Sequence, residues 1–180
     1  LKIGEAISGF ANSAIWLIVG AFLFSRGFIK TGLGKRIAYN LIATFGSSSL
    51  RLSYALALTD LILAPATPSN TARVGGVIMP ITTSLAKAFG SEPQDGPRKI
   101  GSFLMQSIYQ VNTITSAMFQ TSMAGNTLVA ALALQSFGIG ITWGDWAMAA
   151  IVPGIIALII MPYFIYKVYP PEIKDAREAQ

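Results

Sequence analysis

The residues best suited to chemistry lie in one short stretch of apolar sequence, Pro65-Ala66-Thr67-Pro68-Ser69-Asn70-Thr71. Two prolines interrupt a helix here, and hydrocarbon has no water to satisfy the freed backbone groups, so such a break must be buried in protein or line a cavity. The N-terminus of the following helix carries about half a positive charge. Ser69, Asn70 and Thr71 are therefore suited to hold a carboxylate or a coupling ion. Helix capping is the simpler alternative, and Ser69 alone would provide it.

The composition is that of an integral membrane protein. Of the 180 residues, 53% are hydrophobic and 12% are charged, about half the charged fraction of an ordinary soluble domain. Cysteine and histidine are both absent from the sequence, which removes disulfides, thiol nucleophiles, zinc clusters and imidazole bases, so we do not expect an enzyme. The net charge of +5 comes from residues spread over short loops, which does not indicate a nucleic-acid partner.

Hydrophobic run lengths predict an all-α fold, a polytopic helical bundle with a re-entrant helical hairpin and a discontinuous helix. Residues 6–25 are long enough to span, residues 52–64 are too short, and the apolar stretch at 100–137 is interrupted by polar side chains. The expected units are residues 1–51 (spanning helix, then interfacial amphipathic helix), 52–89 (re-entrant hairpin), 90–137 (loop and discontinuous helix), 138–166 (last spanning helix, with Trp143 and Trp146 at an interface) and 167–180 (tail or linker).

The distribution of basic residues predicts which ends of these helices face the cytoplasm. Eleven of the thirteen Lys and Arg residues fall in 26–51, in 87–99 and in the tail from 167 onward, whereas the loop at 138–145 has none. The positive-inside rule places these three segments, the C-terminal tail included, in the cytoplasm, as in a multi-pass bacterial inner-membrane protein surrounded by lipid. Two full spans over 52–89 would give the same sides, so the hairpin depends on arm length and the proline break.

Asp60 and Arg73 are the two formal charges of the predicted hairpin before it reaches water at Lys87. Charges at this depth are costly and are usually paired or functional. One interpretation is that they neutralise each other and brace the hairpin. The other assigns Arg73 to a substrate carboxylate and Asp60 to a coupling cation or proton.

A second polar region lies on the predicted discontinuous helix. Asn112, Thr113 and Thr115 carry oxygens that, with unwound backbone, could form a cage for sodium. Gly125-Asn126-Thr127 resembles Ser69-Asn70-Thr71, so Asn126 and Thr127 join the candidate substrate contacts. The alternative is polar contact between helices, a common use of Ser, Thr and Asn in membranes.

Several of these segments resemble the divalent anion:sodium symporter family, most closely the branch of bacterial citrate or succinate antiporters and plastid 2-oxoglutarate/malate translocators. The resemblance runs along nearly the whole chain. It is carried by Ser69-Asn70-Thr71 with its flanking Pro65, Pro68 and Arg73, by Ser8-Gly9-Phe10-Ala11-Asn12-Ser13, by Ser25-Arg26-Gly27-Phe28, by Ile114-Thr115-Ser116-Ala117 and by Tyr169-Pro170-Pro171-Glu172.

The resemblance implies a protein of two inverted repeats, of which this chain holds the first. Each repeat would contribute one re-entrant hairpin, with a dicarboxylate between the two Ser-Asn-Thr loops. A scaffold domain containing residues 1–51 would form a homodimer, and a transport domain would move like an elevator. The family's substrate contacts map to Ser69, Asn70 and Thr71, and its first sodium site maps to Ser69 and Asn70. The unwound segment around 112–115 would lie opposite them.

We therefore expect a secondary active transporter of di- or tricarboxylates, of the 2-oxoglutarate, malate, succinate or citrate type, that works by exchange. Two departures from the family pattern weaken sodium coupling: Pro65 replaces a hydroxyl residue, and Asn126 lacks a preceding double proline. A sodium-coupled symporter remains the alternative of the same class. A non-transporting membrane structural or assembly subunit and a channel for small anions are the alternatives from other classes.

Overall fold

The computed structural model describes residues 3, 7–11 and 13–175, and within them the chain is helical, without a strand. This agrees with the predicted all-α class. The elements are η1 (Ser8–Ala11), α2 (Ser13–Thr31), α3 (Leu33–Phe45), α4 (Ser49–Leu63), η2 (Ala64–Ala66), α5 (Asn70–Arg73), the π-helix η3 (Val74–Ile78), α6 (Met79–Ala88), α7 (Gly101–Met118), η4 (Gln120–Ser122), α8 (Ala124–Phe137) and α9 (Trp143–Val168).

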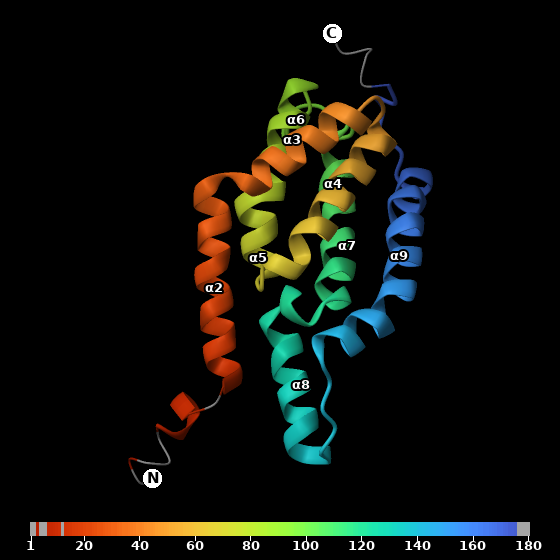
Figure 1. Cartoon of the computed structure of the whole chain (residues 1–180). Coiled ribbons are helices and arrows are strands. Elements are labelled where there is room, and N and C mark those ends of the chain that lie inside the picture. Colours follow the sequence, from red (N-terminus) through yellow and green to blue (C-terminus); the bar gives the residue numbers. More distant parts are fainter. Residues whose placement is uncertain (1–2, 4–6, 12, 176–180) are drawn as a thin grey trace.

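The first long helix lies further along the chain than its hydropathy predicted. We expected a span over 6–25, but α2 begins at Ser13 and continues through Arg26 and Lys30 to Thr31; residues 4–6 and 12 lie outside the described part. Gly32, with a φ of 67°, adopts the left-handed conformation that glycine tolerates, and the chain turns into α3 there. α3 crosses the upper end of the molecule between α2 and α4 (Figure 1).

The chain reverses direction at the double-proline segment. The Ser48 hydroxyl caps the start of α4 by accepting the Arg51 N–H, and α4 ends at Leu63, just before Pro65. After the turn at Thr67 and Pro68, α5, η3 and α6 return toward the end where α4 began (Figure 1). The π-helix precedes Pro80, which has no N–H for the Gly76 carbonyl, and the Met79 N–H instead reaches back five residues to Val74.

The segment that we expected to be discontinuous has its break at 119–123. α7 runs without interruption through Asn112, Thr113 and Thr115 and ends at Met118, and α8 begins at Ala124. The expectation that the backbone is unwound around 112–115 is therefore wrong. Both flanking residues of η4, Phe119 and Met123, have extended backbone.

The last helix, α9, rises alongside α7 (Figure 1). Its 26 residues cover the predicted last unit, 138–166, from residue 143 to its end, and it is the one helix in the described part of the chain that is long and apolar enough to cross a membrane by length and composition. The predicted tail leaves α9 but stays in contact with the fold. Glu172 and Ile173 donate backbone hydrogen bonds to Arg98 and Lys99, and Ser49 donates to Lys174. Residues 176–180 lie outside the described part.

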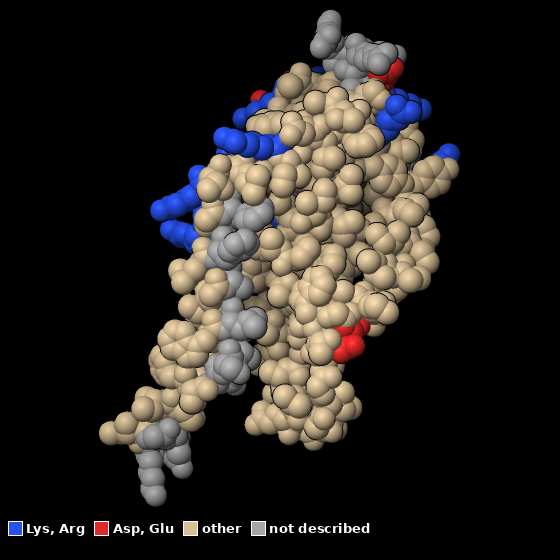
Figure 2. Space-filling model, in the orientation of Figure 1, with Lys and Arg blue, Asp and Glu red and all other residues tan. Residues whose placement is uncertain are grey.

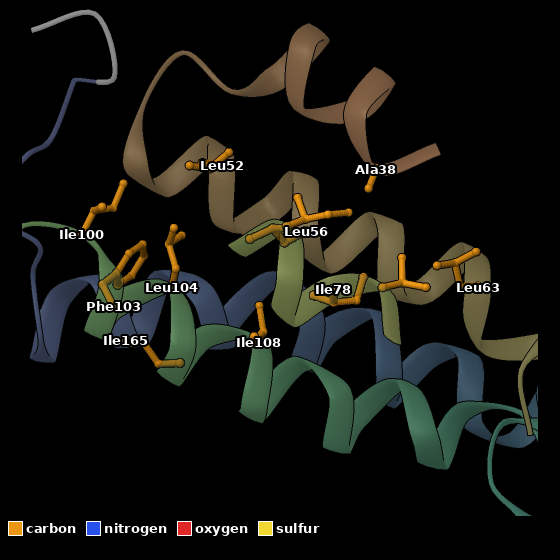
Figure 3. Close-up of a cluster of buried hydrophobic side chains, with 12 residues drawn as sticks. Ala38, Leu52, Leu56, Leu63, Ile78, Ile100, Phe103, Leu104, Ile108 and Ile165 are labelled. Atoms are coloured by element: carbon orange, nitrogen blue, oxygen red, sulfur yellow. The ribbon is translucent and has the colours of Figure 1, made fainter. Parts of the chain in front are cut away.

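The main apolar core joins the hairpin to α3, α7 and α9 (Figure 3). Its buried members are Ala38, Leu52, Leu56, Leu63, Val77, Ile78, Ile81, Ile100, Phe103, Leu104, Ile108 and Ile165. Lys and Arg side chains gather over the upper part of the face shown in Figure 2, near α2 and α3 and near the end of α9. The hairpin tip and the break at 119–123 lie away from these charges, near the middle of the molecule (Figure 1).

Candidate functional site

A buried ion pair joins the two arms of the hairpin. Arg73 Nε lies 2.7 Å from Asp60 Oδ1, and their side chains are 0% and 3% exposed. Asn112 Nδ2 donates to Asp60 Oδ2 at 3.2 Å, and the Thr115 hydroxyl donates to the same oxygen. The carboxylate is therefore surrounded by donors from both α5 and α7.

The Arg73 guanidinium has five N–H donors, and all of them are used. Besides Asp60, the donors reach Thr67 O (3.1 Å) at the hairpin tip and Ser122 O (3.2 Å) in the break, together with Thr115 Oγ1 (3.3 Å) and Ser116 Oγ (3.1 Å) at the end of α7. One side chain thus holds the hairpin tip against the end of α7. This geometry favours the bracing interpretation of the Asp60–Arg73 pair, and the predicted contact of Arg73 with substrate stays a prediction.

The carbonyls released by the break are bound by side chains. The last turn of any helix leaves carbonyls without helical partners, and in an apolar setting each needs a donor. Asn126 Nδ2 donates to Ser116 O (2.7 Å) and Phe119 O (2.9 Å), Thr127 Oγ1 donates to Gln120 O (3.2 Å), and Trp146 Nε1 donates to Ala117 O (2.9 Å). The candidate substrate residues Asn126 and Thr127 therefore lie in the first turn of α8, next to the break, and stabilise it.

Ser69, Asn70 and Thr71 begin the returning arm at the tip. The Ser69 hydroxyl caps the helix by accepting the Ala72 N–H at 3.2 Å, as the simpler interpretation predicted, and Asn70 Oδ1 accepts the Thr71 N–H at 2.9 Å. Ser69 and Asn70 are half-buried and Thr71 is exposed. Within the described part of the chain, the Ser69 and Thr71 hydroxyls and the Asn70 amide group donate no hydrogen bond of their own.

The candidate sodium residues are only partly brought together. Asn112 and Thr115 meet at Asp60, whereas Thr113 is exposed and its hydroxyl donates to Tyr109 O at 3.1 Å. No hydrogen bond in the described structure joins Ser69 or Asn70 to these three residues. The sodium site therefore stays a prediction.

Several residues of this region were not foreseen from the sequence. Ser116, Thr121 and Ser122 carry no pattern that separates them from other small polar residues of membrane helices. Trp143 and Trp146 were expected at a membrane interface; the Trp143 indole N–H donates to Thr121 Oγ1 in the break, and the Trp146 indole N–H donates to Ala117 O in the last turn of α7. The one sequence feature that could have indicated these contacts is that both tryptophans closely follow the predicted discontinuous helix.

Two helix breaks packed together, with unused donors at one of them, resemble the solute sites of membrane transporters. The whole chain, residues 1–180, matches the family described as sodium:sulfate symporter transmembrane region, and the chain belongs to that family. This confirms the resemblance drawn from the sequence, and it establishes the class as membrane transporters and not enzymes.

Three relatives illustrate the match. The chain is 58% identical over 180 residues to a putative malate transporter of Bacillus subtilis, covering 99% of this chain and 38% of the relative. It is 50% identical over 180 residues to the chloroplastic dicarboxylate transporter 1 of spinach, covering 99% and 32%. It is 43% identical over 171 residues to the L-tartrate/succinate antiporter of Escherichia coli, covering 94% and 35%. The chain thus spans about a third of the length of these relatives.

Proposed function

We propose that the full-length protein is a secondary active transporter that exchanges dicarboxylates, and that this chain supplies one half of the substrate site. The observation that carries the proposal is the hairpin tip, where Ser69, Asn70 and Thr71 present donors that the described chain does not use. The names of the relatives, which include malate and dicarboxylate transporters and a tartrate/succinate antiporter, support the substrate class. They also favour transport over the structural-subunit and channel alternatives.

The tip would hold one carboxylate of the substrate. Residues 70–88 form a nearly continuous helical arm whose N-terminus lies at Ser69, so its partial positive charge and the donors of Ser69, Asn70 and Thr71 converge on the same place. The second carboxylate would bind outside this chain, at an equivalent tip in an inverted second repeat. The hairpin would be re-entrant. Arg73 and Asp60 would stabilise the hairpin and would not contact the substrate.

Larger features of the transporter follow the same proposal. Residues 1–51 would belong to a scaffold that forms a homodimer in the lipid bilayer, and the hairpin with α7 and α8 would move across it in an elevator-type step. The basic end of the molecule and the tail would face the cytoplasm (Figure 2). The tip would alternate between access from the two sides.

Sodium-coupled symport is the second candidate, because the family description itself names sodium. Ser69 and Asn70, with Asn112, Thr113 and Thr115, would then include the cation ligands. In the described structure Asn112 and Thr115 already bind Asp60, which favours exchange without sodium.

Counterflow in liposomes containing the full-length protein tests the proposal. Exchange predicts that labelled succinate or 2-oxoglutarate accumulates only when unlabelled dicarboxylate is inside, with or without sodium. Accumulation that requires an inward sodium gradient would instead establish the symporter. No uptake under either condition, by protein that melts cooperatively, would reject both, and protein-free liposomes provide the background.

A further inference from the structure

The Thr121 hydroxyl, in the break at 119–123, connects the hairpin tip to the first turn of α9. Trp143 Nε1 donates to Thr121 Oγ1 at 3.0 Å, and Thr121 Oγ1 lies 2.7 Å from Pro65 O. An indole N–H can only donate, so the single hydroxyl hydrogen of Thr121 is left to point at the Pro65 carbonyl. The two hydrogen bonds therefore run in one direction, from α9 through the break to the hairpin tip.

The sequence of the tip leaves the Pro65 carbonyl in need of a distant donor. Pro65 lies in the 3₁₀ turn Ala64–Ala66, where a carbonyl normally accepts the N–H three residues later. That residue is Pro68, which has no N–H. The Thr121 hydroxyl takes the place of the missing donor. Its acceptor, the Pro65 carbonyl, lies four residues before Ser69.

The position of Trp143 is fixed from two sides. Its ring stacks on Phe119, with centroids 5.8 Å apart and an interplanar angle of 15°. The turn that carries it begins with a capping box, in which Thr142 and Asp145 each bind the other's backbone N–H. The donor is thus held in place by the fold and does not depend on Thr121 alone.

We infer that Trp143 and Thr121 are positioning residues that set where the hairpin tip lies relative to the break, and hence where Ser69, Asn70 and Thr71 meet the substrate. The effect on transport rests on the proposed function, but the effect on the tip does not. Loss of the Trp143 N–H would let the Thr121 hydroxyl rotate away from Pro65. The backbone of the tip would then leave its closed conformation more often. Binding of a dicarboxylate would have to restore that conformation, which lowers the affinity.

Hydrogen–deuterium exchange of the full-length protein in nanodiscs, without substrate, tests this directly. Trp143→Phe keeps a ring against Phe119 but removes the donor, Thr121→Val removes the hydroxyl, and Thr121→Ser keeps it. We expect exchange over 64–71 to be roughly fivefold faster in the first two variants, as for the loss of one net hydrogen bond, and close to wild type in Thr121→Ser. The double variant should be no faster than Thr121→Val, because both changes break the same connection.

Trp146→Phe is the matched control, since it removes an indole donor from the same turn of α9 but leaves Thr121 untouched. Unchanged tip exchange in Trp143→Phe, or equal acceleration in Trp146→Phe, would overturn the inference. In counterflow, Trp143→Phe should raise the KM for dicarboxylate several-fold with little change in kcat. If the wild type fails to transport any dicarboxylate while the exchange pattern holds, the proposed function fails and the positioning inference survives.

Discussion

Asp60 and Arg73 approach from opposite arms of one hairpin and meet at 2.7 Å in the buried interior. They are 13 positions apart in sequence, and the turn between them contains both prolines and the Ser69-Asn70-Thr71 triplet. The pair therefore closes the base of the loop that carries the candidate substrate residues. Of the four further hydrogen bonds from Arg73, one reaches Thr67 O within the loop, and three attach the loop to the end of α7 and to Ser122 in the break.

Replacing Arg73 by glutamine should destabilise the full-length protein by about 3–5 kcal/mol, because it leaves the Asp60 carboxylate buried without its ion-pair partner. Thermal unfolding in detergent measures the loss. Lys87→Gln removes one positive charge from an exposed position and should melt like wild type. An Arg73→Gln protein that melts normally but binds dicarboxylate more weakly would instead make Arg73 a substrate ligand.

Replacing Asn126 by aspartate should loosen the break. The change is nearly isosteric but replaces the donor to Ser116 O and Phe119 O by an acceptor, so these carbonyls keep only their hydrogen bonds from Ser122 and face a carboxylate oxygen. We expect a loss of about 1–3 kcal/mol and faster amide exchange over 119–123. Asn40→Asp, at an exposed position of α3, serves as the control; equal melting temperatures for the two variants would argue against a structural role of Asn126.

Replacing Gly154 by alanine should separate α7 from α9. A Cβ at this position would lie 2.5 Å from Met118 Cγ and 2.7 Å from its sulfur, and Met118 is buried. Such overpacking costs about 1–3 kcal/mol in thermal unfolding. In a Met118→Ala background the Gly154→Ala change should cost much less, because the clash is then absent. Gly144→Ala is the control in the same helix, where the nearest atom is 3.8 Å away, and comparable damage there would refute the steric explanation.

The hairpin turn could be predicted from the sequence because its cause is local: Pro65 and Pro68 remove backbone donors in an apolar stretch. The break at 119–123 could not be located, because neither proline nor glycine occurs in it. It depends on donors that arrive from elsewhere in the fold, such as Asn126 and Trp146. Polar composition and the family resemblance pointed to 112–115, where the helix is intact.

The end of α2 shows a different limit of sequence reasoning. Arg26 and Lys30 end the apolar stretch, and we ended the predicted helix with it, but a charge does not stop a helix. Gly32 does, through its left-handed backbone. The pairing of Asp60 with Arg73 was among the alternatives because two opposite charges in one apolar hairpin are stabilised by an ion pair. The role of Ser116 and Ser122 could be seen only in the three-dimensional structure.

Equilibrium binding of labelled dicarboxylate to the purified full-length protein is the most direct test of the central claim, that the tip residues hold the substrate. Ser69→Ala and Asn70→Ala should each raise the Kd about tenfold or more, since hydrogen bonds to a charged group contribute about 1.5–3 kcal/mol. Thr83→Ala, which removes an exposed hydroxyl further along the same arm, should bind like wild type. Wild-type affinity in both tip variants, with normal melting, would contradict the account.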